Sequence, residues 1–317
     1  MTSEPDHESI YLSSGIQAET ISINTGNPRS YHQAITEPSE IPPVEIFGKL
    51  FIPRGPGPFP VVIVVPGSLG IAPSHINKAE HFTSSSIATC VIDPFGSRGV
   101  TSTVANQAQY TFAASAWDVL ATAKTLLESD EIDATRIGAQ GHSRGGSAVL
   151  SAASISQFMQ DDFSLLGIYA AYPWSGHQFL HPKVGQSRIR AVIGERDEWC
   201  LPQQVQGHIH AIQLLGGDAS FRLFADAQHS FDRDTPVEMI DDASVSPGAP
   251  TVYIDDDGTL IDPRTSLPDQ NLTERDLMLY SVKTGHGRRG AQLGSQRDQA
   301  KAFDDDMMAF WKDLFNL

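Results

Sequence analysis

Gly141-His-Ser-Arg-Gly145 matches the pattern G-x-S-x-G, between a strand expected at residues 136–142 and a helix of small residues expected at 144–157. In such a turn the serine takes strained backbone angles and the strand and helix approach closely, so the flanking residues must be small. The turn lifts the hydroxyl of Ser143 above the carboxyl edge of the sheet, where ligands bind in open α/β folds. The pattern therefore predicts a serine nucleophile; a glycine-rich turn with an idle serine is the alternative.

Expected strands and helices alternate on both sides of this turn. The other strands are expected at residues 47–52, 61–65, 88–93, 165–172, 189–193 and 221–224, and the other helices at 75–84, 104–129, 202–215 and, closing the chain, 292–315. The run at 61–65 is continuous and β-branched, which is typical of a strand buried on both faces. The alternation predicts an α/β fold with a mostly parallel central sheet and helices on both faces.

The remaining segments divide the chain into an arm and one domain. Residues 1–44 are polar and predict an N-terminal arm with a short strand near 20–24, and residues 45–317 form the domain. The alternation of expected strands and helices is interrupted at about 234–289. Within this segment, residues 251–262 predict a hairpin turning at Asp257-Gly258. About 55 residues are few for an independent core, so this segment is expected to be an insertion.

Composition excludes several classes of protein. The 317 residues are 40% hydrophobic and 19% charged, which is unlike collagen, coiled coils and disordered chains. With 22 basic and 38 acidic residues the net charge is −16, so neither nucleic acid nor an anionic membrane is an expected partner. Two cysteines, a polar N-terminus without an apolar core segment and the lack of a long apolar run predict a soluble, cytoplasmic protein.

A serine nucleophile needs a general base and an orienting carboxylate. In this fold class the acid and then the histidine follow the serine in the chain. Asp197 and His229 each stand just beyond an expected strand, so both can project from the same edge of the sheet as Ser143. Glu195 and Asp226 are the competing acids.

The oxyanion formed during acyl transfer needs two backbone N–H donors. One is expected from Arg144, the residue after the nucleophile, and the other from Ser68 in the loop Pro66-Gly-Ser-Leu-Gly70; an ordinary glycine turn is the alternative for that loop. His208-x-His210 does not suggest a metal site, because residues at i and i+2 of a helix point apart. No metal and no cofactor are expected.

Together these residues resemble the α/β-hydrolase superfamily and, more narrowly, the dienelactone hydrolase family. The local matches beyond the three expected catalytic residues are Pro66-Gly-Ser-Leu-Gly-Ile71, Asp93-Pro-Phe-Gly-Ser-Arg98 and His229-Ser-Phe-Asp-Arg233. The resemblance implies ester hydrolysis, with Arg98 and Arg233 clamping an anionic group of the substrate. Ion pairs with the abundant surface acids are the alternative role for these two arginines.

The sequence also departs from the family pattern. Ser143 stands where dienelactone hydrolase itself has a cysteine, Arg98 is one residue further from Asp93, and the arm and the insertion have no counterpart. The resemblance therefore implies the fold and ester hydrolysis but not the dienelactone substrate. Three aromatic residues near the expected strand ends are candidate pocket walls or, equally, core residues: Tyr172, Trp174 and Trp199.

The sequence thus predicts a serine hydrolase that cleaves small carboxylic esters or lactones through an acyl-enzyme. Two alternatives stay open: an amide or small-peptide hydrolase of the prolyl-oligopeptidase kind, and a non-catalytic binding protein with the hydrolase fold. The chain has no propeller-sized N-terminal domain, which counts against the peptidase, and no expected catalytic residue is missing, which counts against the binding protein. The expected partner is a small molecule, and a homodimer is left open.

Overall fold

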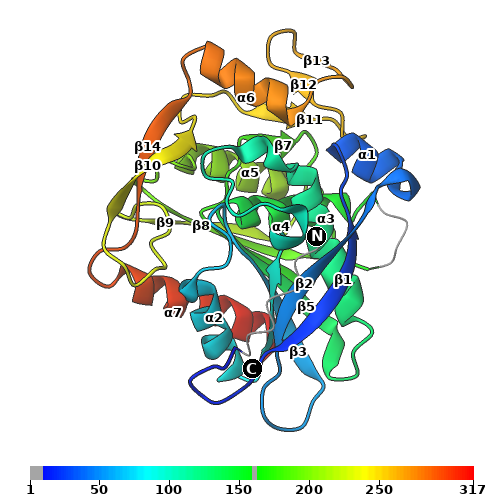
Figure 1. The fold of residues 1–317 in the computed structure, drawn as a ribbon, viewed down its shortest axis with the longest axis vertical. Coiled ribbons are helices and arrows are strands. Elements are labelled where there is room, and N and C mark those ends of the chain that lie inside the picture. Colours follow the sequence, from blue (N-terminus) through cyan, green and yellow to red (C-terminus); the bar gives the residue numbers. More distant parts are fainter. Residues whose placement is uncertain (1–9, 159–162) are drawn as a thin grey trace.

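The computed structural model describes residues 10–158 and 163–317 (Figure 1). Its centre is an eight-stranded sheet in the order β1-β2-β4-β3-β5-β6-β8-β9. The strands are β1 (Glu19–Gly26), β2 (Pro43–Phe51), β3 (Phe59–Val65), β4 (Ala88–Asp93), β5 (Ile132–His142), β6 (Gly167–Ala171), β8 (Arg188–Gly194) and β9 (Ala219–Phe224). β2 pairs antiparallel with β1 and β4, and the other neighbours are parallel. The predicted α/β fold with a mostly parallel sheet is therefore confirmed.

Helices cover both faces of the sheet. In Figure 1, α2 (Pro73–Thr83) and α7 (Gln299–Phe315) lie on one side, and α3 (Phe112–Leu126) and α4 (Arg144–Ile155) on the other. Trp311 of α7 lies so close to Gly138 of β5 that a Cβ atom at Gly138 would be 2.3 Å from its ring. All seven residues of β3 are buried, as their continuous apolar run predicted. α5 (Pro202–Leu214) packs against β8 and β9. These layers hold the central strands rigidly beneath the site.

Two predicted helices begin later than expected. α3 starts at Phe112, not Val104, because the side chain of Thr111 accepts a hydrogen bond from the backbone of Ala114 and caps the helix. The preceding residues instead form a loop with a short 3₁₀ turn, η3 (Gln107–Gln109). The closing helix α7 starts at Gln299 because residues 292 and 293 belong to a strand, β14 (Arg288–Leu293). These later helix starts matter because the residues that precede α3 and α7 lie near the site.

The segment before residue 45 contributes an edge of the main sheet. The strand expected near residues 20–24 is part of β1, which pairs with β2 along its whole length. A short helix, α1 (Tyr31–Thr36), and a 3₁₀ turn, η1 (Pro38–Glu40), connect β1 to β2, and a second turn later in the chain, η2 (Gly96–Arg98), contacts β2. Residues 1–9 of the expected arm lie outside the described residues.

The segment expected to be an insertion carries small sheets and one helix. β10 (Glu238–Val245) pairs with β14, β11 (Val252–Ile254) with β7 (His177–Phe179), and β12 (Ile261–Asp262) with β13 (Leu267–Pro268), and α6 (Glu274–Lys283) follows. Of the hairpin expected at residues 251–262, the turn is present, with Gly258 at φ +84°, but its arms meet only at one bridge, between Ile254 and Leu260. The pairing of β11 with β7 attaches this segment to the loop after β6, above the carboxyl edge of the sheet.

Candidate active site

Ser143 occupies the sharp turn between β5 and α4. Its backbone angles are φ 55° and ψ −116°, a conformation that L residues rarely adopt. A Cβ atom at Gly141 would lie 1.9 Å from the carbonyl oxygen of Gly145, and one at Gly145 would lie 2.3 Å from that of Val65. Glycine is therefore required on both sides of Ser143, as the sequence pattern implied, and the strained turn holds the hydroxyl clear of the sheet.

Three side chains form one hydrogen-bonded row at this edge, which we call the Ser–His–Asp row (Ser143, His229 and Asp197). His229 Nε2 lies 2.9 Å from Ser143 Oγ, and His229 Nδ1 lies 2.7 Å from Asp197 Oδ2. The other oxygen of Asp197 accepts the backbone N–H groups of Trp199 and Cys200, both at 2.9 Å. Both carboxylate oxygens are thus engaged, so the orientation of the imidazole is fixed.

The competing acids lie outside this row. Asp226 pairs with Arg196, and Glu195 accepts the backbone N–H of Asp226. Asp226 and Arg196 are both more than half exposed, whereas Asp197 and His229 are buried. Among the described residues, Asp197 is therefore the carboxylate that contacts His229.

The loop after β3 lies against Ser143. A Cβ atom at Gly67 would be 3.2 Å from the Cβ of Ser143, so this loop passes the nucleophile at van der Waals distance. The carbonyl of Ser68 accepts the backbone N–H of Thr103 at 2.8 Å, and its hydroxyl bonds the side chain of Gln107, which fixes the loop. Arg144 is the first residue of α4, so its N–H has no acceptor within the helix. Both expected donors, Ser68 and Arg144, thus border the same space.

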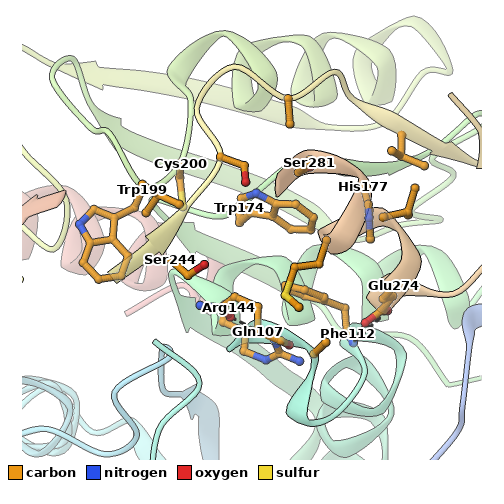
Figure 2. A pocket seen from close by; sticks show the side chains of 18 of the residues that line it. Gln107, Phe112, Arg144, Trp174, His177, Trp199, Cys200, Ser244, Glu274 and Ser281 are labelled. Carbon is orange, nitrogen blue, oxygen red and sulfur yellow. Dashed lines mark hydrogen bonds between the residues drawn. The ribbon is translucent and has the colours of Figure 1, made fainter. Parts of the chain in front are cut away.

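A cavity of about 130 Å³ opens beside Ser143 (Figure 2). One wall comes from the core, including Trp174, and the roof comes from β10, β11 and α6 of the insertion. The lining residues are Ser68, Gln107, Ala108, Phe112, Ser143, Arg144, Trp174, Gly176, His177, Trp199, Cys200, Gln204, Ser244, Val245, Ser246, Ala249, Pro250, Val252, Glu274, Leu277, Met278, Tyr280 and Ser281. Aromatic and aliphatic walls with a few polar groups are the usual make-up of a small-molecule site.

The three predicted aromatic residues take different positions. Trp174 and Trp199 line the cavity, and the indole of Trp199 lies 5.2 Å from the imidazole of His229 in a stacked arrangement. Tyr172 is buried below His229, with ring centroids 4.8 Å apart, and lines a second, smaller cavity of about 20 Å³ on the other side of Ser143. All three therefore surround the Ser–His–Asp row.

The two arginines predicted to contact the substrate occupy different places in the structure. Arg233 lines the smaller cavity together with Ser143 and His229. Arg98 does not reach either cavity: both of its terminal nitrogens bond the buried carboxylate of Asp118, at 2.8 and 2.9 Å, and one also bonds the carbonyl of Gly26. The expected clamp by Arg98 is therefore wrong, because this arginine neutralises a core carboxylate and ties β1 to α3.

A second buried carboxylate lies behind the row. The hydroxyl of Tyr172 donates to Asp232 at 2.6 Å, and Lys78 lies 3.4 Å from the same carboxylate. Burial favours the neutral form of Asp232, but Lys78 and neighbouring groups outweigh it and hold its pKa well below the usual range. Burial lowers the pKa of His142 to about 4, so the imidazole in this group is neutral. These buried charged groups hold the side chain of Tyr172 in place, and Tyr172 in turn packs against the imidazole of His229.

Cys200 lies beside the row with its side chain in the larger cavity. The atoms of Asp197, Cys200 and His229 able to bind a metal lie within 4.8 Å of one another. However, the hydrogen bond between His229 and Asp197 already uses two of these groups, and burial raises the pKa of the Cys200 thiol well above its usual value. A protonated thiol is a poor metal ligand, so the donor set fits proton transfer better than metal binding.

Sequence reasoning missed the residues that shape the cavity away from Ser143. Phe112, His177 and Glu274 come from three distant parts of the chain. Glu274 follows Thr273, which caps α6 with Asp276, and such a capping pattern predicts only where the helix begins. Burial raises the pKa of Glu274 to about 7, against the opposing effects of the Phe112 N–H and Arg144. No local pattern places this carboxyl in a cavity with Ser143.

Residues 46–247 match the family model described as the dienelactone hydrolase family. The chain belongs to this family. The match spans the sheet from β2 onward, all three residues of the row and the first part of the insertion. The dienelactone hydrolase family consists of hydrolases with the α/β-hydrolase fold, so the predicted resemblance is confirmed at this level.

Solved structures share the fold of this family member at low sequence identity. A dienelactone hydrolase-like promiscuous phosphotriesterase, P91 from metagenomic libraries, is 15% identical with a TM-score of 0.50; the match covers 84% of this chain and 95% of P91. A structure titled m3DLH is 16% identical with a TM-score of 0.53 and the same coverages. A dienelactone hydrolase described as putative, from Klebsiella pneumoniae, is 15% identical with a TM-score of 0.50, covering 68% of this chain and 89% of that one. No curated protein matches.

None of the helices among the described residues combines the length and the apolar character needed to cross a membrane.

Proposed function

We propose that this family member is a serine esterase that cleaves small carboxylic esters or lactones through an acyl-enzyme. The observation that carries the proposal is the Ser–His–Asp row, with hydrogen bonds of 2.9 and 2.7 Å, at the mouth of a cavity with apolar walls. A hydroxyl, an imidazole and a carboxylate in this order are the arrangement that activates serine for acyl transfer.

The proposed reaction begins with attack by Ser143 Oγ on the ester carbonyl. His229 Nε2 takes the hydroxyl proton and passes it to the leaving alcohol, while Asp197 orients the ring and stabilises the imidazolium. The N–H groups of Ser68 and Arg144 hold the oxyanion, and loss of one such donor typically costs about 3 kcal/mol of barrier. Water then attacks the acyl-enzyme by the same route and releases the acid.

The two cavities suggest how a substrate divides around Ser143. The cavity of about 130 Å³ suits one part of a small ester, and the cavity of about 20 Å³ suits a small group beside Arg233. Arg233 lines this smaller cavity and forms no ion pair with a carboxylate among the described residues, so we expect it to be available to an anionic group there. In this proposal Arg233, without Arg98, is the contact for such a group.

A fluorophosphonate probe tests the nucleophile. We expect stoichiometric labelling on the peptide that contains Ser143, no label in Ser143→Ala, and full labelling in Ser147→Ala, a serine of the same helix outside the row. Absence of label from the folded wild-type protein would favour a binding protein instead. A panel of p-nitrophenyl acyl esters and aminoacyl anilides then separates esterase from peptidase, and faster cleavage of the anilides would overturn the proposed reaction.

A further inference from the structure

The larger cavity is long, and its two ends differ in chemistry. Figure 2 shows Trp199 and Cys200 at one end and His177, Phe112 and Glu274 at the other, with Trp174 between them. The first end adjoins the Ser–His–Asp row, since Trp199 stacks on the imidazole of His229. The second end, which we call the distal end (Phe112, His177 and Glu274), is the part of the cavity that the reaction itself does not use.

Among the described residues that line the distal end, the accessible ionisable group is an acid, Glu274. Two charged side chains are among the residues lining the cavity, Arg144 and Glu274. The guanidinium of Arg144 is buried, donates to the carbonyls of Gln107 and Tyr110 at 2.9 and 2.6 Å, and lies 4.0 Å from the centre of the Phe112 ring. Both terminal nitrogens are held by the protein, and Nε, which has no hydrogen-bond partner among the described residues, is itself buried, so the guanidinium is poorly placed to receive a substrate anion.

The Glu274 carboxylate keeps hydrogen-bonding capacity. Its two oxygens accept the backbone N–H of Phe112, at 3.0 and 2.9 Å, which fixes the carboxylate at the start of α3. A carboxylate has about four acceptor sites, so the backbone N–H groups of Phe112 and the neighbouring Ala113 leave acceptor sites free for another group. Glu274 is therefore held in place by the fold and still able to bind a donor that enters the cavity.

The remaining distal groups suit a flat substrate with a polar tip. Phe112 and Trp174 are stacked, with ring centroids 4.8 Å apart and planes at 26°, and they form an aromatic wall leading to Glu274. His177 contributes a buried Nδ1 that has no hydrogen-bond partner among the described residues. Burial lowers the pKa of His177 to about 4, so this ring adds no positive charge at neutral pH.

We propose that the distal end is a subsite in which Glu274 binds an ammonium or hydroxyl group at the tip of an aryl-containing ester substrate. This specificity rests on the proposed esterase function and deepens it. The Phe112–Trp174 wall takes the aryl ring, and the carboxylate receives the donor at its end. An anionic tip is disfavoured there, because it would meet the Glu274 carboxylate, while the nearby Arg144 guanidinium is already hydrogen-bonded to backbone carbonyls. Glu274 is thus a specificity-determining residue.

The test compares matched esters that differ only at the tip. Methyl esters of 3-arylpropanoic acids with para methyl, hydroxymethyl, aminomethyl or carboxyl groups place the tip on the acyl part, and benzyl acetates with the same groups place it on the alcohol part. In one of the two series we expect kcat/KM to be about tenfold higher for the aminomethyl than for the methyl compound, as for a charge-assisted hydrogen bond, and lowest for the carboxyl compound.

Glu274→Gln isolates the charge, because the amide oxygen still accepts the Phe112 N–H. We expect the aminomethyl preference, measured as the ratio of kcat/KM for the aminomethyl and methyl compounds in the same variant, to fall to about twofold or less. Glu238→Gln is the matched control, since it removes the same charge from an exposed residue of the insertion outside the cavity, and the preference should persist. Equal ratios in wild type and Glu274→Gln, or a wild-type preference for the carboxyl tip, would overturn the proposal.

A second readout needs no variant. The ratio of kcat/KM for the aminomethyl and methyl esters cancels the titration of the catalytic histidine, so it reports on the distal end alone. Of the titratable groups around Glu274, burial lowers the pKa of His177 to about 4 and raises that of Tyr31 well above its usual value. The remaining neighbour is the guanidinium of Arg144. We expect the ratio to be several-fold larger at pH 8 than at pH 5.5, and a ratio independent of pH contradicts the role of Glu274.

These experiments separate the two proposals. If the protein is labelled by fluorophosphonate and hydrolyses the methyl esters without a preference at the tip, the subsite fails and the esterase stands. If no ester is hydrolysed and Ser143 is not labelled, the esterase itself fails.

Discussion

The indole of Trp199 is stacked on the imidazole of His229, with ring centroids 5.2 Å apart and planes at 15°. The indole N–H donates to the carbonyl of Gln292 at 2.9 Å, so β14 holds the indole against the histidine. Trp199 also donates its backbone N–H to Asp197. One residue therefore connects the orienting carboxylate, the imidazole and the strand that follows the insertion.

Loss of this stack should impair the chemical step more than binding. We expect Trp199→Leu to lower kcat by about tenfold, because the ring of His229 loses the wall that orients it, with a smaller change in KM. Steady-state kinetics on a p-nitrophenyl ester measures both constants. Trp117→Leu, on α3 and outside the cavity lining, should leave kcat unchanged. An unchanged kcat in Trp199→Leu would show that Asp197 alone fixes the imidazole.

Asp197→Asn tests the orienting carboxylate. The amide keeps the size of the side chain but cannot stabilise the imidazolium, so we expect kcat to fall by roughly 10³- to 10⁴-fold with the fold retained. The matched control is Asp226→Asn, which alters an exposed acid paired with Arg196 and should retain full activity. Similar activity in both variants would contradict the assignment of Asp197.

The buried pair of Arg98 and Asp118 should matter for stability and not for substrate binding. Arg98→Ala leaves the carboxylate of Asp118 buried without its cation, so we expect the free energy of unfolding to fall by about 3–5 kcal/mol. Chemical denaturation measures this change. The exposed arginine of the Arg29–Glu37 pair offers the control, and Arg29→Ala should cost less than about 1 kcal/mol. A change in KM specific to anionic esters in Arg98→Ala would contradict the position of this residue.

Glu274 should make stability depend on pH near neutrality. Its pKa is raised by burial from 4.5 to about 7, so between these values the folded state binds more protons than the unfolded state. Stability conferred by the neutral carboxyl is therefore present below about pH 4.5 and is lost as the pH rises through about 7. We expect Glu274→Gln, which stays neutral, to reduce the loss of unfolding free energy between pH 5 and 8 by ~1–3 kcal/mol. Parallel curves for wild type and variant would contradict the raised pKa.

Sequence patterns predicted the central sheet because its determinants are local. The buried run of β3 and the strand–turn–helix around Ser143 each show in a few consecutive residues. Chain order and position after strand ends then singled out Asp197 and His229, which the fold brings into contact with Ser143. The start of α3 was missed because a side-chain cap at Thr111 competes with a helical pattern that extends further back.

The positions of the charged side chains could not be predicted in the same way. Arg98 follows a family-like pattern, yet its partner Asp118 lies 20 residues away on another element, and a buried carboxylate attracts a cation wherever the fold puts it.

Local sequence is enough to place a serine on a strained turn at the end of a parallel strand, because the need for small flanking residues and the run of β-branched residues both show in a few consecutive positions. Packing between distant elements is what brings α6 to the cavity beside that serine and so places Glu274 in the same cavity. Residues 131 positions apart meet there through packing and hydrogen bonds between elements, which no local pattern encodes.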